Sequence, residues 1–274
     1  MAWIRLTDQA MYLMEGGEDC YIDKIELQPN TDSSTSLNIP LEWFRDGNSP
    51  RTMIVDRTQT EPSACAILSA SPKTSLGIDV SGHQGTVDWD AVKNAGVSFA
   101  FIKATEGRTF VDDTFARNWS EMKRVGILRG AYHFFLPDRS ADDQAKNFLE
   151  TVNPSSGDLF PVLDIEVTRD MDASAIIKEM KRWLDLVESA VSRKPIIYTF
   201  PNFWSETLGN PVGFSQYPLW IAHFTTAARP IVPGDWNNHT FWQFTESGTV
   251  RGVRTPVDRN RFNGSPTELL NFTI

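Results

Sequence analysis

Cysteine is scarce in this chain of 274 residues, which contains only Cys20 and Cys65. Two cysteines are too few for a disulfide framework, and they do not have the spacing of a zinc site. A small fold held together by disulfides is therefore excluded. The two thiols either pair with each other within the first segment of the chain or remain free.

Positive charge and long apolar runs are also lacking. The formal net charge is −9, whereas binding to nucleic acid or to an anionic membrane needs clustered Lys and Arg that displace counterions. No segment approaches the apolar length of a membrane span. The first twenty residues lack a basic start, an apolar block and a small-residue cleavage site, so we expect no secretory signal peptide. The sequence thus predicts neither a nucleic-acid partner nor a membrane span.

Several common catalytic signatures are absent as well. The chain contains no Gly-x-Ser-x-Gly, no His-Glu-x-x-His, no phosphate loop and no Gly-x-Gly-x-x-Gly motif. The histidines are scattered, and no two of them have the spacing of metal ligands: His83, His133, His223 and His239. We therefore predict that the protein needs no metal and no cofactor.

A stretch rich in Ser and Pro divides the chain. Residues 69–75 (SASPKTS) show no hydrophobic period and are predicted to be a linker. Before them, residues 1–68 hold short runs with strand character between clusters of Gly, Asn, Asp and Pro, which indicates a small β-rich accessory module without a catalytic motif. These runs cover residues 2–6, 20–27, 37–44, 53–57 and 65–68.

Strand-like and helix-like segments alternate in residues 76–274. The clearest helix spans 172–192, where apolar side chains recur with the helical period. Regular alternation predicts a parallel sheet covered by helices, and about eight strands in roughly 200 residues fit a closed barrel better than an open sheet. The predicted fold is thus an α/β barrel whose catalytic groups lie at the C-terminal ends of the strands. The predicted strands cover 76–81, 98–104, 128–135, 160–167, 195–200, 218–224, 240–245 and 255–262.

The acidic triplet Asp164-Ile165-Glu166 interrupts the apolar run 160–167. Burial of charge is costly, so two carboxylates inside a buried strand indicate a function. Residues two apart on a strand project to the same face, so Asp164 and Glu166 form a pair. Mutual repulsion raises the pKa of one of them and leaves an acid and an anion together, as a glycosidase requires. A solvated strand end or a cation site is the alternative.

Two further acids lie near the ends of predicted strands. Asp79 precedes a Gly-rich turn after the first strand of the barrel region, and Asp258 lies on the last strand. Because the first and last strands of a closed barrel are neighbours, Asp79 and Asp258 are expected to share one pocket with Asp164 and Glu166.

Eight short segments follow one another between residues 76 and 264: GIDVSGHQG, FAFIKATEG, GAYHFF, PVLDIEV, PIIYT, LWIAHF, FWQFTESGTV and VDRNRFNG. In this order they resemble the lysozymes of glycoside hydrolase family 25, the Chalaropsis-type N-acetylmuramidases. The resemblance leaves the first 75 residues outside it. It implies a flattened (β/α) barrel with eight strands and five helices, and hydrolysis of the β-1,4 bond between N-acetylmuramic acid and N-acetylglucosamine in peptidoglycan.

The resemblance also implies residue roles. Glu166 corresponds to the proton donor of the family and Asp164 to the acid two residues before it, while Asp79 and Asp258 correspond to the remaining acids of the pocket. For Asp164 we favour orientation of the substrate's 2-acetamido group, which then attacks the anomeric carbon. The alternative is a direct mechanism in which an Asp acts as nucleophile or as base for a water molecule.

Aromatic side chains near the strand ends are candidate sugar contacts. Tyr132, Tyr198, Trp220 and Trp242 are predicted to stack on sugar faces or to hydrogen-bond to the acetamido group, although barrel strands also bury aromatic residues routinely. The resemblance favours contact for Tyr132 and Tyr198 and leaves Trp220 and Trp242 open between contact and core. His133 follows Tyr132 and is expected to point to the opposite face.

We prefer a lysozyme that acts on peptidoglycan glycan strands, with residues 1–74 available for a cell-wall or assembly partner. One alternative is a non-catalytic peptidoglycan-binding or structural component of a phage tail or secretion assembly. A hydrolase of chitin-type glycans is disfavoured, because chitinase-like barrels carry two further Asp where this chain has Leu159 and Val162. Without a secretory signal, we expect synthesis in the cytoplasm and delivery to the cell wall by phage lysis or another export route.

Overall fold

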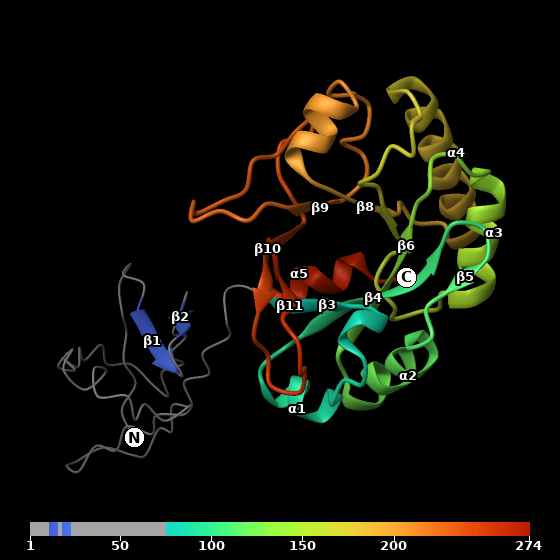
Figure 1. Ribbon diagram of the computed structural model, residues 1–274. Helices are drawn as coiled ribbons and strands as arrows, with labels where there is room; N and C mark the ends of the chain where they lie inside the picture. The colour runs from blue at the N-terminus through green and yellow to red at the C-terminus, as the bar shows by residue number, and fades with distance from the viewer. Residues whose placement is uncertain (1–10, 16–17, 23–74) are drawn as a thin grey trace, which may run out of the picture. The chain divides into compact units, whose positions relative to one another are not determined.

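The computed structural model describes residues 11–15, 18–22 and 75–274 (Figure 1). In the first part, strand β1 (Met11–Glu15) pairs antiparallel with strand β2 (Glu18–Ile22). Strand β2 overlaps the start of the predicted strand 20–27, whereas β1 falls between two predicted runs. The other strands predicted for residues 1–68, and Cys65, lie outside the described residues. The accessory module and the state of the two cysteines therefore stay predictions.

Eight strands of the second part close into a barrel (Figure 1). Their order is β3, β11, β10, β9, β8, β7, β6 and β4, and β4 pairs again with β3. Each coincides with a predicted strand, so the closed α/β barrel is confirmed. The two-residue strand β5 (Phe110–Val111) pairs with the end of β4. The barrel strands are β3 (Leu76–Val80), β4 (Phe99–Glu106), β6 (Leu128–Phe134), β7 (Val162–Asp164), β8 (Ile196–Thr199), β9 (Leu219–Ala222), β10 (Phe241–Gly248) and β11 (Val257–Phe262).

One strand departs from the predicted parallel sheet. Strand β11 runs antiparallel to both of its neighbours, β10 and β3, while the remaining barrel pairs are parallel. Only the short link 249–256 joins β10 to β11, whereas a parallel connection needs a crossover of about a dozen or more residues. The antiparallel direction of β11 therefore follows from the length of this link.

Several helices of the barrel part begin at a residue whose side chain caps the helix. Side chains of Asp88, Ser140 and Asp172 accept backbone N–H bonds at the starts of α1, α3 and α4. Helix α4 matches the predicted helix 172–192. In the described part of the chain, no helix is both long and apolar enough to cross a bilayer. The α-helices are α1 (Trp89–Asn94), α2 (Phe115–Val125), α3 (Ala141–Val152), α4 (Ala173–Val191) and α5 (Pro266–Leu269). The 3₁₀ helices are η2 (Gly82–Gln84) and η4 (Leu270–Phe272), and η3 (Phe203–Thr207) is a short π-helix.

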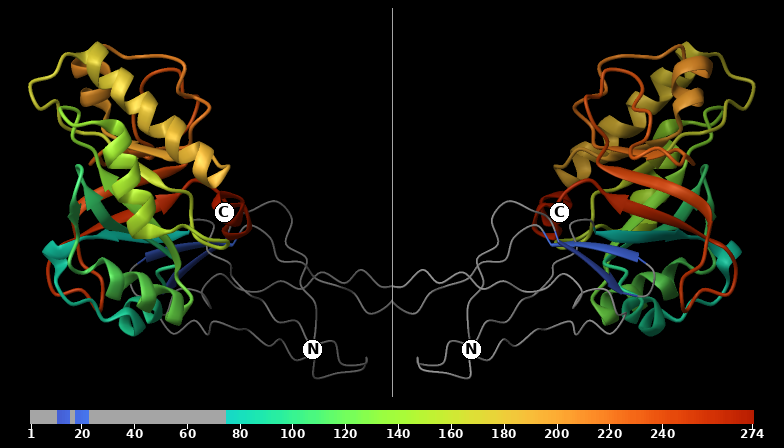
Figure 2. Two further views of the ribbon diagram at one scale, coloured as in Figure 1. Left: turned by 90° about the vertical axis from the view of Figure 1, so that its right-hand side faces the viewer. Right: turned by 90° about the vertical axis from the view of Figure 1, so that its left-hand side faces the viewer.

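Helices cover only part of the barrel wall. Figures 1 and 2 show α2, α3 and α4 along one side, while β10 and β11 form the opposite edge. The C-terminal segment with α5 and η4 packs across the end of the barrel where the parallel strands begin. There the N–H of Phe160 donates to the carbonyl of Phe272, and the N–H of Ile274 donates to that of Asp158. One end of the barrel is thus closed by the chain's own C-terminal segment.

Aromatic residues fill the interior of the barrel. The rings of Phe101 and Trp220 stack with their centroids 4.4 Å apart, and Phe241 packs edge-on against Phe101. A Cβ atom at Gly130 would lie 2.3 Å from the ring of Phe101, so only glycine permits this ring beside strand β6. A second apolar layer lies between the strands and the helices and includes Phe148 and Trp183. These two layers hold the strand ends, and the side chains on them, in fixed positions.

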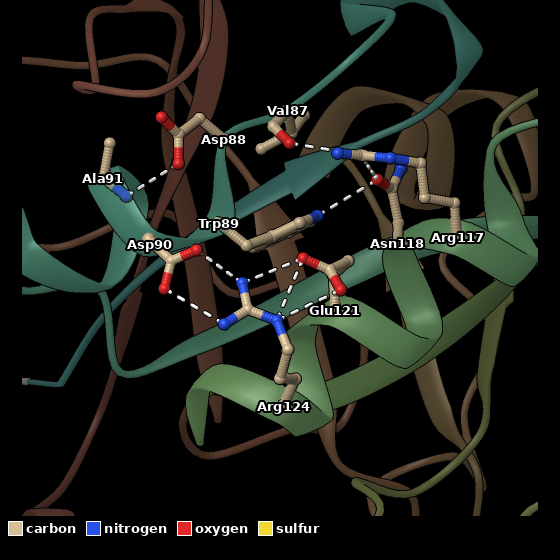
Figure 3. A network of polar contacts seen from close by, with 9 residues as sticks. All are labelled: Val87, Asp88, Trp89, Asp90, Ala91, Arg117, Asn118, Glu121 and Arg124. Carbon is tan, nitrogen blue, oxygen red and sulfur yellow. Dashed lines mark hydrogen bonds and ion pairs between the residues drawn. The ribbon is translucent and has the colours of Figure 1, made fainter.

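Polar contacts join α1 to α2 (Figure 3). The buried indole N–H of Trp89 donates to Oδ1 of Asn118 at 3.1 Å, and Nδ2 of Asn118 is buried without a hydrogen-bond partner in the described part. At the surface, Arg124 pairs with Asp90 and Glu121. These contacts fix α1, and with it the loop that follows β3, against α2.

Candidate active site

A cleft with a volume of about 680 Å³ lies at the end of the barrel where the parallel strands finish. All eight barrel strands, or the loops after them, contribute to its walls. Because β11 is antiparallel, its beginning reaches the cleft, and Asp258 is the second residue of that strand. The structure thus brings the four predicted acids into one cleft together with a fifth: Asp79, Asp164, Glu166, Asp258 and Glu246.

Asp79 and Asp258 lie directly opposite each other in the ladder of β3 and β11. Their carboxyl groups are hydrogen-bonded to each other. Oδ2 of Asp79 also accepts from Nε2 of Gln243 at 2.9 Å and from Nδ2 of Asn260 at 2.7 Å. Several donors around Asp79 favour its charged form, so the proton of the pair belongs on Asp258, which donates to Asp79.

The pKa values of this pair follow from the same contacts. Burial raises the pKa of Asp258 to about 8, and the negative charge of Asp79 adds to the shift. Burial also raises the pKa of Asp79, but the hydrogen bonds from Asn260 and Gln243 oppose that shift. The pair therefore carries one proton at neutral pH.

Replacing Asp258 by Asn is expected to make folding less sensitive to alkaline pH. The carboxyl of Asp258 has an ordinary pKa of 3.8, which folding raises to about 8. Between these values the folded state holds a proton that the unfolded state has lost, so stability falls as the pH rises. Asn keeps a donor toward Asp79 and does not titrate. The melting temperature of Asp258→Asn minus that of the parent should increase from about pH 4 to about pH 8 and then level off. Thermal unfolding in a pH series measures this difference, and a pH-independent difference would contradict the assignment.

Strand β7 is shorter than predicted, so Glu166 lies two residues beyond its end. Glu166 and Asp164 nevertheless both line the cleft, because the N–H of Ile165 bonds to strand β8 and continues the alternation by one residue. Burial raises the pKa of Asp164 well above its ordinary value, and the charge of Glu166 adds to the shift. Burial and the charge of Asp79 raise the pKa of Glu166. The cleft therefore favours a protonated Glu166.

Asp164 carries an oxygen without a partner. Its residue is 5 % exposed, and Oδ1 is buried without a hydrogen bond to any described residue. Buried polar atoms in native structures are normally paired, and an unpaired one costs free energy. Since Asp164 lines the cleft, a hydrogen-bond donor on a bound molecule would satisfy this oxygen.

Lys103 enters the cleft from β4. Its Nζ bonds to Oε2 of Glu106 at 2.6 Å and lies 4.9 Å from the ring centroid of Phe134. Its positive charge lowers the pKa of both Asp164 and Glu166, against the effect of burial. Lys103 is thus a cation that balances part of the negative charge of the cleft.

Three of the four predicted aromatic residues line the cleft, and one does not. Tyr132, Tyr198 and Trp220 are lining residues. Trp242 is not among them: it packs in the layer outside the strands, and its Nε1 donates to the carbonyl of His223. Strand alternation explains this, because the next residue, Gln243, is the one that faces the cleft.

His133 faces away from the cleft, as predicted. Its ring stacks on Trp183, with centroids 5.6 Å apart, in the outer apolar layer. Burial lowers its pKa to about 3, so the ring is neutral. It bonds to the side chains of Thr105 and Gln144. In the residues that the structure describes, no three His, Cys, Asp or Glu side chains are arranged to hold a metal ion.

Comparison with known proteins identifies the family. Residues 78–253 match Glycosyl hydrolases family 25. The chain belongs to this family. Protein YegX of Escherichia coli (strain K12) is 43% identical over 213 residues, which cover 76% of each chain. Lysozyme M1 of Streptomyces globisporus is 40% identical over 205 residues, which cover 71% of this chain and 69% of that protein. The crystal structure of a bacterial lysozyme from Streptomyces coelicolor has a TM-score of 0.69 and 37% identity, and covers 72% of this chain and 96% of that one. Family 25 membership confirms the resemblance of the eight ordered segments.

Three polar side chains of this family 25 cleft region are not indicated by the sequence motifs: Lys103, Gln243 and Asn260. Each nevertheless lies within one of the eight segments, and each is a polar residue in a strand that is otherwise largely apolar or that carries a cleft acid. Asn260 is two residues from Asp258 and therefore shares its face. These three residues could be recognised from the sequence as polar residues on the inward face of a barrel strand.

Proposed function

We propose that this family 25 hydrolase cleaves the β-1,4 bond between N-acetylmuramic acid and N-acetylglucosamine in peptidoglycan. The observation that carries the proposal is Oδ1 of Asp164, which is buried on the wall of the cleft, has no hydrogen-bond partner among the described residues, and lies beside a Glu166 whose pKa is raised. A general acid that keeps its proton and a carboxyl oxygen that awaits a hydrogen-bond donor are the two groups that substrate-assisted hydrolysis needs. The lysozyme and muramidase relatives support the same substrate.

The reaction proceeds in two steps. Glu166 gives its proton to the glycosidic oxygen while the acetamido carbonyl oxygen of the muramic acid residue attacks C1, and the C1–O bond to the leaving sugar breaks. Asp164 accepts a hydrogen bond from the acetamido N–H and stabilises the positive charge of the resulting oxazolinium ion. Water then attacks C1, Glu166 takes one proton from that water, and the ring opens to restore the acetamido group. The anomeric configuration is retained.

The family match begins at residue 78, and we assign an accessory role to residues 1–74, attachment to the cell wall or to a partner assembly. The cleft then acts on glycan strands that this attachment brings within reach.

Product analysis tests the proposed bond. Purified peptidoglycan is digested, the new reducing ends are reduced with borohydride, and the amino sugars are identified after acid hydrolysis. Reduced muramic acid is the expected product. Reduced glucosamine would show that the other glycosidic bond is cleaved, and the absence of new reducing ends would favour a protein that only binds walls. Chitin oligomers in a parallel digest should be cleaved more slowly than peptidoglycan.

A further inference from the structure

Two buried amide side chains, Gln243 and Asn260, hold Asp79 from two neighbouring strands. Oδ1 of Asn260 accepts from Nε1 of Trp220 at 2.8 Å, and Nδ2 of Asn260 donates to Asp79 at 2.7 Å. Oε1 of Gln243 accepts from the hydroxyl of Tyr198 at 3.0 Å, and Nε2 of Gln243 donates to Asp79 at 2.9 Å. We call these two residues the amide pair. Each member thus links an aromatic donor to one and the same carboxylate oxygen.

The direction of these bonds is fixed by chemistry. An indole N–H only donates, so the oxygen of Asn260 must face Trp220 and its NH₂ group must face Asp79. Burial raises the pKa of Tyr198 well above its ordinary value, so its hydroxyl keeps the proton that it donates to Gln243. Both amides therefore present N–H groups, and not oxygens, to Asp79.

Burial leaves the amide pair no other arrangement. Asn260 is 0 % exposed and Gln243 is 4 % exposed. Turning either amide over would place two donors, or two acceptors, against each other at buried atoms, where an unpaired polar group is costly. The amide pair therefore acts as a rigid donor on one side of Asp79.

We propose that Gln243 and Asn260 are positioning residues, which keep Asp79 in its charged form and leave the proton of the Asp79–Asp258 pair on Asp258. This inference rests on the proposed function of the cleft and extends it to residues that do not touch the reacting atoms. The charge of Asp79 in turn favours the protonated form of Glu166. The amide pair thus acts on the proton donor through Asp79.

Other titratable groups line the cleft together with Asp79. They come from the loop after β3, from β4, β6, β7, β8, β9, β10 and β11, and they are His83, Lys103, Tyr132, Asp164, Glu166, Tyr198, His223, Glu246 and Asp258. The test therefore removes a donor from Asp79 and leaves all of these groups in place.

The variant Asn260→Leu removes one donor from Asp79 and adds no charge. The midpoint of Asp79 ionisation, followed by carbon NMR of its labelled carboxyl group, should move up by about one pH unit, because a hydrogen bond to a charged group stabilises that form by this order. The acidic limb of the kcat/KM profile on cell walls should move up with it. Asn260→Asp should behave differently, because a protonated carboxyl reproduces both bonds. It should match the parent at acidic pH and lose activity as the new carboxyl ionises.

Asn118 provides a matched control. It also accepts an indole N–H bond, from Trp89, in a buried position (Figure 3), and in the described part of the chain no hydrogen bond joins it to a cleft acid. Asn118→Leu should lower the melting temperature and leave both the Asp79 midpoint and the acidic limb unchanged. If Asn260→Leu does not fold, Gln243→Met removes the other donor and carries the same expectation.

An Asp79 midpoint that stays at the parental pH in Asn260→Leu or Gln243→Met would overturn the inference, whatever the activity. The Asp79 midpoint could move in the variant while the parent protein releases no reducing ends from walls. That result would support the inference about Asp79 and overturn the proposed function. The NMR titration and the wall digest thus separate the two.

Discussion

Replacing Glu166 by Gln is expected to lower kcat on purified cell walls by about 1000-fold with little change in KM. Gln has nearly the same shape and still reaches the glycosidic oxygen, but it has no proton of suitable acidity to give. In the parent, burial and the charge of Asp79 raise the pKa of Glu166, so its carboxyl group holds the proton that it donates. Release of reducing ends from walls, measured over a range of wall concentrations, gives both constants.

The leaving group offers a sharper test of the same role. An aryl glycoside whose phenol departs without protonation does not need a general acid. The defect of Glu166→Gln should therefore shrink strongly on a dinitrophenyl glycoside of the N-acetylated sugar and stay large on walls. An equal defect on both substrates would assign Glu166 to binding or to charge stabilisation.

Glu246 supplies the matched control. It lines the same cleft but is exposed. Glu246→Gln makes the same Glu-to-Gln change in the same cleft and should change kcat by less than about tenfold, since it removes no proton donor. Equal losses in the two variants would show that the cleft has no single donor.

The sequence predicts the barrel and the convergence of its acids for a physical reason. Strands and helices alternate with distinct hydrophobic periods, and a closed barrel makes the first and last strands neighbours, so Asp79 and Asp258 had to meet. Their meeting is closer than barrel closure alone requires, because antiparallel β11 places them in register. That direction depends on the length of one link and not on the pattern within the strand.

Side-chain facing was harder to predict than strand position. Trp242 and Gln243 are adjacent on β10, so their side chains point to opposite faces of the strand. A shift of the strand register by one residue would exchange which of the two enters the cleft. The sequence leaves Trp242 open between sugar contact and core, and the structure places it in the layer outside the strands and Gln243 on the cleft face. The sequence does not indicate Lys103 as a cleft residue. A single cation in an apolar strand can be recognised as one only when the acids that other strands bring near it are known.

Asp164 is expected to be a residue whose loss harms catalysis and not folding. Asp164→Asn should lower kcat by about 100- to 1000-fold, because a neutral amide stabilises the positive oxazolinium ion less well than a carboxylate. The same variant should keep or raise the melting temperature at neutral and alkaline pH. The parental carboxyl is buried, its pKa is raised well above the ordinary value, and its Oδ1 has no partner in the part of the chain that the structure describes. Ionising it in the folded protein therefore costs free energy that Asn avoids.

Azide separates this role from the direct mechanism. If Asp164 were the nucleophile, or the base for water, Asp164→Ala would open the α face of the sugar, and azide would restore the rate and yield an α-glycosyl azide. If the acetamido group attacks C1, it occupies that face in every variant, and azide should neither accelerate Asp164→Ala nor give the α product. Fluorination of the substrate's N-acyl group should then slow the parent, because it weakens the attacking carbonyl oxygen. Among the residues that the structure describes, none donates to the buried Oδ1 of Asp164. The acetamido N–H of the bound sugar supplies this donor, so the oxygen is paired only while substrate occupies the cleft.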